Sequence, residues 1–111
     1  MRFQSTEGLL DVRHVSSKEY IILDLLRSGA ELYGLEMVKL SDGTLKRGTI
    51  YVTLGRMVEK GYLTSRQEKT PDDPGLPRRF FVITGDGRLA LQAADNVRAI
   101  MQGSVGGWQN A

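Results

Sequence analysis

The chain has 111 residues, of which 41% are hydrophobic and 25% are charged, so its composition is that of one folded globular domain and not of a disordered segment. It contains no cysteine, which excludes disulfides, thiol nucleophiles and thiolate metal sites. The single histidine, His14, is better explained by solvation or packing than by metal binding. Because no catalytic set can be assembled, an enzyme is the least favoured class, and no cofactor is expected.

No stretch reaches the roughly 20 apolar residues that span a bilayer, so we expect a cytoplasmic protein without a membrane partner. The formal net charge is only +2, yet residues 46–79 carry +4 and the remainder −2. This asymmetry is equally compatible with an anionic partner for one surface and with an ordinary solvated face. The charged residues of the segment are Lys46, Arg47, Arg56, Lys60, Arg66, Lys69, Arg78 and Arg79, against Glu59, Glu68, Asp72 and Asp73.

The first helix is predicted to begin at Ser16, because Ser16 and Glu19 match a capping box. Val15 and Tyr20 stand where a hydrophobic staple would pack, and a Ser-Gly pair ends the apolar repeat. Residues 1–15 show no clear period and are expected to form an arm or a short extra helix. Apolar residues of this arm could pack against the last helix of the chain; they are Leu9, Leu10, Val12 and Val15.

Two further helices are predicted, from about Leu32 to Leu40 and from about Lys46 to Lys60. The turn "SDG" closes the first of them, and Gly61 stands in the position of a C-terminal cap for the second. The runs "YLTSRQEK" and "RRFFVIT" then favour two strands, and the breaker-rich "TPDDPGLP" between them predicts a hairpin with a long, mobile tip.

The last helix is predicted over residues 85–102, with Thr84 as its cap. The glycine-rich residues 103–111 are expected to form a flexible tail, in which Trp108 is exposed or contacts a partner. Three helices followed by a hairpin predict an α+β fold, a winged helix-turn-helix domain over residues 16–84 with an appended C-terminal helix. In such a domain the third helix enters the DNA major groove.

The third helix has two different faces on a wheel of 100° per residue. An arc of about 120° is apolar and is predicted to face the core. The opposite arc is predicted to contact DNA through threonine hydroxyls, an arginine that can bind guanine and a lysine that can bind phosphate; a solvated surface is the alternative. The predicted core residues are Ile50, Tyr51, Leu54, Met57 and Val58, and the outward residues are Thr49, Val52, Thr53, Arg56 and Lys60.

Gly48 lies in the predicted first turn of this helix, where glycine lowers helix stability by up to about 1 kcal/mol relative to alanine. Its presence indicates a close approach of the backbone to another group. A phosphate at the helix N-terminus would suit this position, and a neighbouring side chain is the alternative.

Three motifs together resemble the PadR family of bacterial transcriptional regulators: "YGLEM" at 33–37, "GTIYVTLGRMVEKGYL" at 48–63 and "RRFFVITGDGR" at 78–88. The resemblance covers about residues 17–100. By position, Gly48, Thr49 and Tyr51 match the family's helix-start motif, and Arg78 and Arg79 match the base of its wing. The sequence departs from the pattern where Val52 replaces a proline and Lys46 a capping residue.

The resemblance implies a homodimer, usually a repressor, that binds a palindromic operator in double-stranded DNA and pairs through its C-terminal helix. Some family members bind aromatic ligands near the dimer interface, so a small aromatic effector is a further implication. The last helix carries a stripe that could fold back onto its own core or pair with a second copy. We favour pairing, because a symmetric operator needs two winged-helix domains to bind its two halves. The stripe consists of Leu89, Ala93, Val97 and Ile100.

The predicted function is therefore that of a sequence-specific DNA-binding transcriptional regulator. A winged-helix module that binds protein is the alternative, since the same fold serves both purposes. The residues predicted to contact DNA are Lys46, Arg47, Gly48, Thr49, Tyr51, Val52, Thr53, Arg56, Lys60, Arg78 and Arg79.

Overall fold

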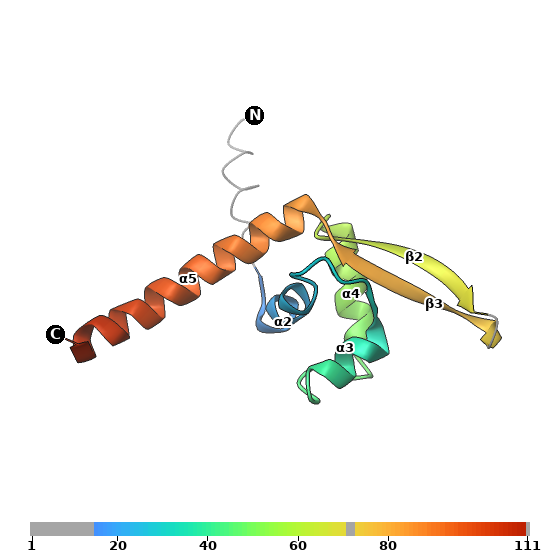
Figure 1. The fold of residues 1–111 in the computed structure, drawn as a ribbon, viewed down its shortest axis with the longest axis horizontal. Coiled ribbons are helices and arrows are strands. Elements are labelled where there is room, and N and C mark those ends of the chain that lie inside the picture. The colour runs from blue at the N-terminus through green and yellow to red at the C-terminus, as the bar shows by residue number, and fades with distance from the viewer. Residues whose placement is uncertain (1–14, 71–72, 111) are drawn as a thin grey trace.

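The computed structural model describes residues 15–70 and 73–110, with side chains for 15–68 and 78–102. In Figure 1 the helices α2, α3 and α4 form the centre, the β2–β3 hairpin extends to one side, and α5 runs away on the other. This is an α+β winged-helix fold, as predicted. Residues 1–14 of the predicted N-terminal arm, which include His14, and the Trp108 side chain lie outside the described part. The elements are α2 Ser17–Leu25, β1 Leu32–Tyr33, α3 Gly34–Leu40, α4 Ile50–Glu59, β2 Leu63–Thr70, β3 Asp73–Ile83 and α5 Gly85–Asn110.

The start of α2 confirms the predicted capping box. The Ser16 hydroxyl accepts a hydrogen bond from the Glu19 amide at 3.2 Å, and the Glu19 carboxylate accepts one from the Ser16 amide at 2.9 Å. Val15 and Tyr20 both pack against the core. The two bonds satisfy amides that the helix itself leaves without acceptors, so this boundary follows from local chemistry.

The sheet has three strands in the order β1-β3-β2, one more than the predicted hairpin. Leu32 and Tyr33 pair with Phe81 and Phe80, so the prediction that the second helix begins at Leu32 is wrong. These two residues gain strand hydrogen bonds and cross-strand aromatic contact, which outweigh a weak helical preference. Helix α3 therefore begins at Gly34.

The hairpin strands continue into the segment predicted to be a loop. β2 runs to Thr70 and β3 begins at Asp73, with a bulge between Glu68 and Thr70. β1 pairs only with the far end of β3, so the outer part of β3 has one open edge. Proline is tolerated at such an edge, which explains how the breaker-rich segment can still be strand.

Both predicted boundary caps around the hairpin are confirmed. Gly61 has φ +84°, its amide bonds to the Val58 carbonyl at 3.0 Å, and the Tyr62 amide bonds to the Met57 carbonyl at 2.9 Å. This pair of bonds is a Schellman motif. The Thr84 hydroxyl accepts from the Gly87 amide at 2.9 Å and so caps α5.

Helix α5 is longer than predicted and continues to Asn110, through the segment expected to be a flexible tail. Glycine costs about 1 kcal/mol in a helix interior but keeps its amide, so a helix already nucleated can propagate through it.

The core lies between α2, α3, α4, the sheet and the first two turns of α5. α5 is seated closely: a β-carbon at Gly87 would lie 2.2 Å from the Tyr62 carbonyl oxygen. Only a glycine allows the helix to approach the chain at this distance. The buried residues are Ile22, Leu23, Leu26, Met37, Leu45, Ile50, Leu54, Met57, Tyr62, Leu63, Phe81, Ile83, Ala90 and Leu91.

Candidate nucleic-acid interface

Helix α4 is buried on one face and exposed on the other. Ile50, Leu54 and Met57 are fully buried, as predicted. Tyr51 and Val58 were predicted for the same face but are 50% and 36% exposed, so this part of the prediction is wrong. The small core covers only a narrow stripe of the helix, and residues at its margin remain in solvent.

Tyr51 is nevertheless held in place by the neighbouring helix. A β-carbon at Gly34, the first residue of α3, would lie 2.7 Å from the Tyr51 ring. The absence of a side chain at Gly34 thus allows the ring to lie against α3 while its other side stays exposed. This arrangement turns a predicted core residue into part of the outer surface, and Tyr51 is also among the residues predicted to contact DNA.

The outward face of α4 is formed by Val52, Gly55 and Arg56, all exposed. Among the described residues, the Arg56 side chain has no hydrogen bond or ion pair. Its guanidinium therefore keeps all of its donors available for guanine or phosphate. Thr53 points outward less than predicted: it is half-buried, and its hydroxyl donates to the Thr49 carbonyl at 3.3 Å.

The chain enters α4 through an exposed turn at residues 46–49. The Lys46 carbonyl accepts from the amides of Thr49 and Ile50 at 3.2 and 2.9 Å, so the helix begins four residues later than predicted. Glycine at position 48 disfavours an earlier start. A β-carbon at Gly48 would meet nothing within 4 Å. No described neighbour explains this glycine, and the space beside it is open to an external group.

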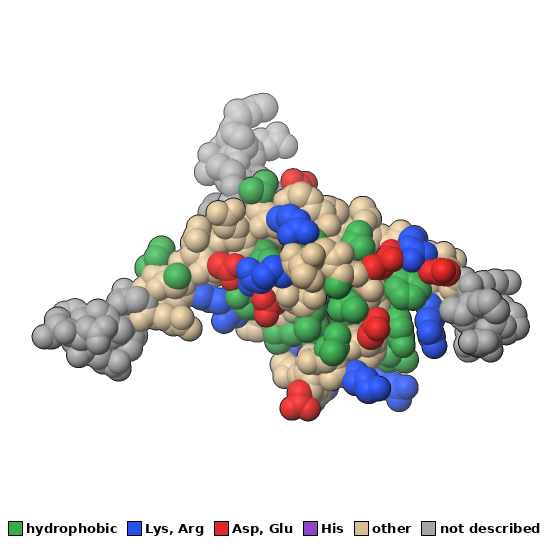
Figure 2. All heavy atoms as spheres, in the orientation of Figure 1, with side chains coloured by type: hydrophobic (Ala, Val, Ile, Leu, Met, Phe, Trp, Pro, Cys, Tyr) green, Lys and Arg blue, Asp and Glu red, His purple; other side chains and the backbone are tan. Residues whose placement is uncertain are grey.

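Thr49 is the N-cap of α4, but its side chain makes no capping hydrogen bond. Lys46 and Arg47 are exposed beside it. In Figure 2, basic side chains lie over the lower end of α3 and α4 and beside the hairpin, with hydrophobic side chains between them. A helix N-terminus with uncapped amides and adjacent cations is suited to bind phosphate.

Lys60 is engaged within the protein. Its amine lies 2.8 Å from the Glu19 carboxylate, which is 5% exposed, and 5.5 Å from the centre of the Tyr62 ring. Burial opposes ionisation of Glu19, but the Lys60 amine and the Ser16 amide outweigh it, and the pKa of Glu19 is lowered. The structure thus uses Lys60 to fasten α4 to α2, whereas the sequence predicted a phosphate contact.

Acidification is expected to destabilise the protein through Glu19. Because its folded pKa lies below the ordinary value of 4.5, the carboxylate stabilises the fold above that pH, and this stability is lost as pH falls through the lower folded pKa. Glu19→Gln should flatten the dependence of the unfolding free energy on pH below about 5, measured by urea denaturation. Glu59→Gln, at an exposed position, is the control. An unchanged slope in Glu19→Gln would refute the assignment.

The two predicted wing residues lie on opposite faces of β3. The Arg78 guanidinium stacks 4.7 Å above the centre of the Tyr33 ring, and Tyr33 in turn packs edge-on against Phe80 at 5.6 Å. Arg79 donates to the Ser65 hydroxyl at 3.0 Å. Both arginines are exposed, and these contacts orient them without neutralising their charge. Tyr33 is therefore a supporting residue that the predicted set omits, although it begins the "YGLEM" motif.

Arg66 differs from the other wing arginines because carboxylates already bind it. Its guanidinium donates to Glu31 at 2.7 Å and to Glu68 at 2.8 Å. The hydrogen bond from Arg66 lowers the pKa of Glu31. The sequence shows these charges but not their pairing, since Glu31 lies 35 residues from Arg66. Arg66 therefore contributes little free positive charge to the wing.

The predicted dimer stripe lies largely in solvent. Leu89, Val97 and Ile100 are 52%, 56% and 67% exposed, while Ala93 is half-buried. The residues of α5 that face its own core are instead Ala90 and Leu91, next to Gly87. Of the two interpretations, folding back onto the core does not fit this exposure. Met101, 65% exposed, extends the apolar face beyond the predicted residues.

Comparison with known families shows to which protein family the chain belongs. The model of the transcriptional regulator PadR-like family matches residues 22–93, which begin in the second half of α2 and extend through α3, α4 and the sheet into the start of α5. The chain belongs to this family. PadR-like proteins are transcriptional regulators and not enzymes, in agreement with the lack of a catalytic set in the sequence.

Solved structures of PadR-like proteins share the fold. A PadR family regulator from Clostridium difficile R20291 has a TM-score of 0.67 at 22% identity, covering 81% of this chain and 95% of that one. A PadR-like transcription factor from Bacteroides fragilis has the same TM-score at 21% identity, covering 95% and 94%. Bacillus subtilis PadR, solved in complex with operator DNA, has a TM-score of 0.60 at 25% identity, covering 66% and 43%.

No curated protein sequence matches the chain. Within residues 15–70 and 73–110, no helix combines the length and the apolar character needed to cross a membrane. The same residues gather no group of three or more His, Cys, Asp or Glu side chains that could hold a metal ion.

Proposed function

We propose that this PadR-like protein binds double-stranded DNA sequence-specifically as a homodimer and represses transcription from a palindromic operator. The observation that carries the proposal is the outward face of α4, where the Arg56 guanidinium has no hydrogen-bond or ion-pair partner among the described residues and lies opposite a fully buried apolar face. A helix held in this way can enter the major groove without giving up contacts in its own fold.

The contacts are expected to divide between two surfaces. Val52 and Arg56 would read base edges from within the groove, the valine methyls toward thymine and the guanidinium toward guanine. The turn at 46–49 and the wing arginines Arg78 and Arg79 would bind the phosphate backbone. In support, Bacillus subtilis PadR, which has a related fold, was solved in complex with operator DNA.

The dimer is supported by the exposed apolar face of α5. Leu89, Val97 and Ile100 are each more than half exposed, which is unusual for aliphatic side chains that share one helix face. Pairing with a second copy would remove them from water and place two heads on one duplex. The resemblance to the PadR family is the basis for proposing repression, and for proposing control by a small aromatic molecule near this interface.

DNA binding is tested with the duplex that flanks the protein's own gene. The affinity should fall by about 10³–10⁵ between 50 and 200 mM salt, as expected for 6–10 phosphate contacts. Transcription from the same promoter in vitro should decrease when the protein is added. Absence of binding to any such duplex at low salt would sink the proposal and leave a protein-binding module as the explanation of the fold.

Arg56→Ala is expected to weaken specific binding by about 1–3 kcal/mol, because one bidentate contact to a base is lost. The fold should not change, since the side chain is exposed and makes no hydrogen bond or ion pair with another described residue. Lys18→Ala, which removes an exposed positive charge from α2, is the matched control. The measurement is fluorescence anisotropy with labelled operator. Equal affinities of the two variants and the wild type would show that Arg56 is only a solvated side chain.

A further inference from the structure

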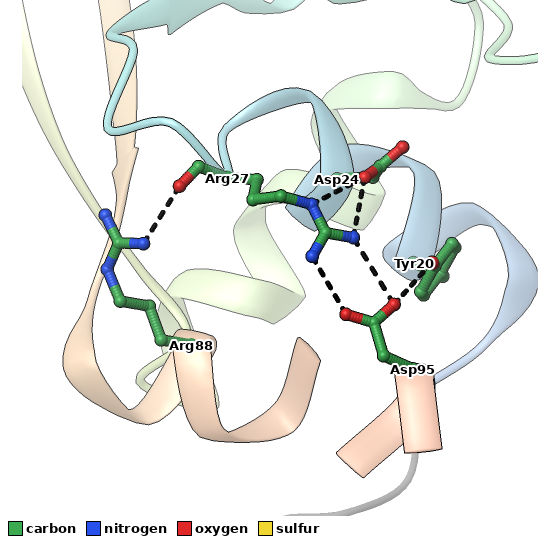
Figure 3. A network of polar contacts seen from close by, with 5 residues as sticks. All are labelled: Tyr20, Asp24, Arg27, Arg88 and Asp95. Atoms are coloured by element: carbon green, nitrogen blue, oxygen red, sulfur yellow. Dashed lines mark hydrogen bonds and ion pairs between the residues drawn. The ribbon is translucent and has the colours of Figure 1, made fainter. Parts of the chain in front are cut away.

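Helix α5 is tied to α2 by polar contacts at successive turns (Figure 3). Near its start, the Arg88 guanidinium donates to the Arg27 carbonyl at 2.9 Å. Two turns later, the Asp95 carboxylate accepts from the Tyr20 hydroxyl at 2.6 Å and from the Arg27 guanidinium at 2.9 Å. Arg27 is itself held by Asp24 at 2.8 Å. We call Tyr20, Arg27 and Asp95 the α2–α5 clamp.

A fourth contact completes this connection. The Arg98 guanidinium lies 3.8 Å from the centre of the Tyr20 ring, so the ring is held by Asp95 at its hydroxyl and by Arg98 at its face. The Arg27 guanidinium and the Tyr20 hydroxyl lower the pKa of Asp95. The carboxylate is therefore ionised at neutral pH, and the hydrogen bonds that it accepts from Tyr20 and Arg27 are charge-assisted.

The clamp lies on the side of α5 opposite to its exposed apolar face. At 100° per residue, Arg88, Asp95 and Arg98 fall within an arc of about 80°. Leu89, Val97 and Ile100 fall within another arc of about 80°, centred roughly 180° away. One side of the helix is thus fastened to the winged-helix domain of residues 16–84, which we call the DNA-binding head. The other side remains available to a second copy.

The clamp also marks where the head stops holding the helix. Ala90 and Leu91, 0% and 3% exposed, seat the first two turns of α5 in the core. Farther along, the polar and ring contacts of α5 with the head among the described residues are those of Asp95 and Arg98. Ala93 and Ala94 are half-buried, and Ile100 is 67% exposed. The direction in which α5 extends from the head, and with it the orientation of the apolar face, therefore depends on Asp95.

We infer that Asp95 is a positioning residue that sets the distance between the two DNA-reading helices of the dimer and thereby the half-site spacing of the operator. The inference rests on the proposed function and adds a determinant of specificity to it. A small change in the angle between α5 and the head at Asp95 moves the DNA-reading helix α4, which lies far from the dimer contact. The two copies of α4 must reach sites about one helical turn, or 34–36 Å, apart on the DNA, so such a movement changes the spacing that they fit.

The first test measures the DNA-free dimer. The chain has no cysteine, so Lys39→Cys on the exposed side of α3 introduces one spin label in each head. Pulsed dipolar spectroscopy should give one narrow label-to-label distance distribution for the otherwise wild-type dimer. Asp95→Ala should broaden or shift it. Gln102→Ala is the matched control, since Gln102 is exposed and lies seven residues farther on the same side of α5.

The second test measures binding to operators whose half-sites are moved by single base pairs. The wild type should prefer its best spacing at least about 10-fold, because each inserted pair rotates one site about the helix axis. Asp95→Ala should reduce this preference to less than about 3-fold while affinity for one half-site stays unchanged. Tyr20→Phe removes only the clamp hydroxyl and should give a smaller change in the same direction, even if Asp95→Ala folds poorly.

The outcomes separate this inference from the function on which it rests. A dimer whose distance distribution and spacing preference are unchanged by both Asp95→Ala and Tyr20→Phe overturns the clamp alone. A wild-type chain that sediments as a monomer forms no dimer, and this overturns the proposed function together with the inference.

Discussion

Gly87→Ala is expected to destabilise the protein by at least about 2 kcal/mol, a cost typical of overpacking against a rigid neighbour. The added β-carbon would lie 2.2 Å from the Tyr62 carbonyl oxygen and 2.9 Å from a side-chain carbon of Ile83. The carbonyl cannot turn aside, because it accepts the Thr84 amide at 2.9 Å. The first turn of α5 must therefore move away from the chain, which would disturb the seating of Ala90 and Leu91.

The measurement is thermal or urea unfolding, in which a loss of this size lowers the melting temperature by roughly 10 °C for a domain of about 100 residues. Gly85→Ala is the matched control, since Gly85 lies in the same helical turn as Gly87 but a β-carbon at Gly85 would meet nothing within 4 Å. It should be neutral or stabilise by up to about 1 kcal/mol, as alanine is the better helix former. Equal stability of the two variants would contradict the close-approach explanation.

The parts of the fold that the sequence predicts correctly depend on residues close together in the chain. The capping box of Ser16 and Glu19 spans three residues, as does the cap that Thr84 provides for Gly87. Gly61 ends α4 through bonds to residues within the preceding turn. Such signals can be read from sequence because their energetics are local.

The errors occur where distant residues decide the outcome. Leu32 and Tyr33 become a strand only because β3 passes beside them, almost 50 residues later in the chain. Tyr51 is placed on the surface by Gly34, which belongs to another helix. A helical wheel contains neither neighbour, so it assigns Tyr51 to the core.

In the candidate site, too, features set by local spacing could be predicted, and contacts between distant residues could not. The outward position of Arg56 and Val52 follows from helical spacing alone. The pairing of Lys60 with Glu19 joins residues 41 positions apart, and the clamp joins Tyr20 to Asp95 across 75 positions. No pattern in the sequence identifies these pairs, because many charged residues could have met in their place. The structure thereby distinguishes the arginines that are free to meet DNA from the cations that hold the fold together.

Val97→Glu is expected to abolish the dimer while leaving each head folded. Val97 is already 56% exposed and lies on the apolar face of α5, so a glutamate costs the isolated chain little. In a paired helix the same substitution would bury a charge without a partner in each subunit, which is strongly unfavourable. Sedimentation should show a monomer. Thermal unfolding should still show a cooperative transition of each folded head, at a melting temperature that no longer depends on protein concentration.

Loss of the dimer should lower the affinity for a two-site operator by about 10²–10⁴, because the second head no longer binds at a high effective concentration. Affinity for a single half-site should remain within a few-fold of the wild type, which distinguishes loss of pairing from damage to the reading helix. Gln92→Glu adds the same charge at an exposed position outside the apolar stripe and is the control for simple repulsion from DNA. If Val97→Glu sediments as a dimer, the heads are joined by another surface, and the exposed stripe on α5 requires a different partner.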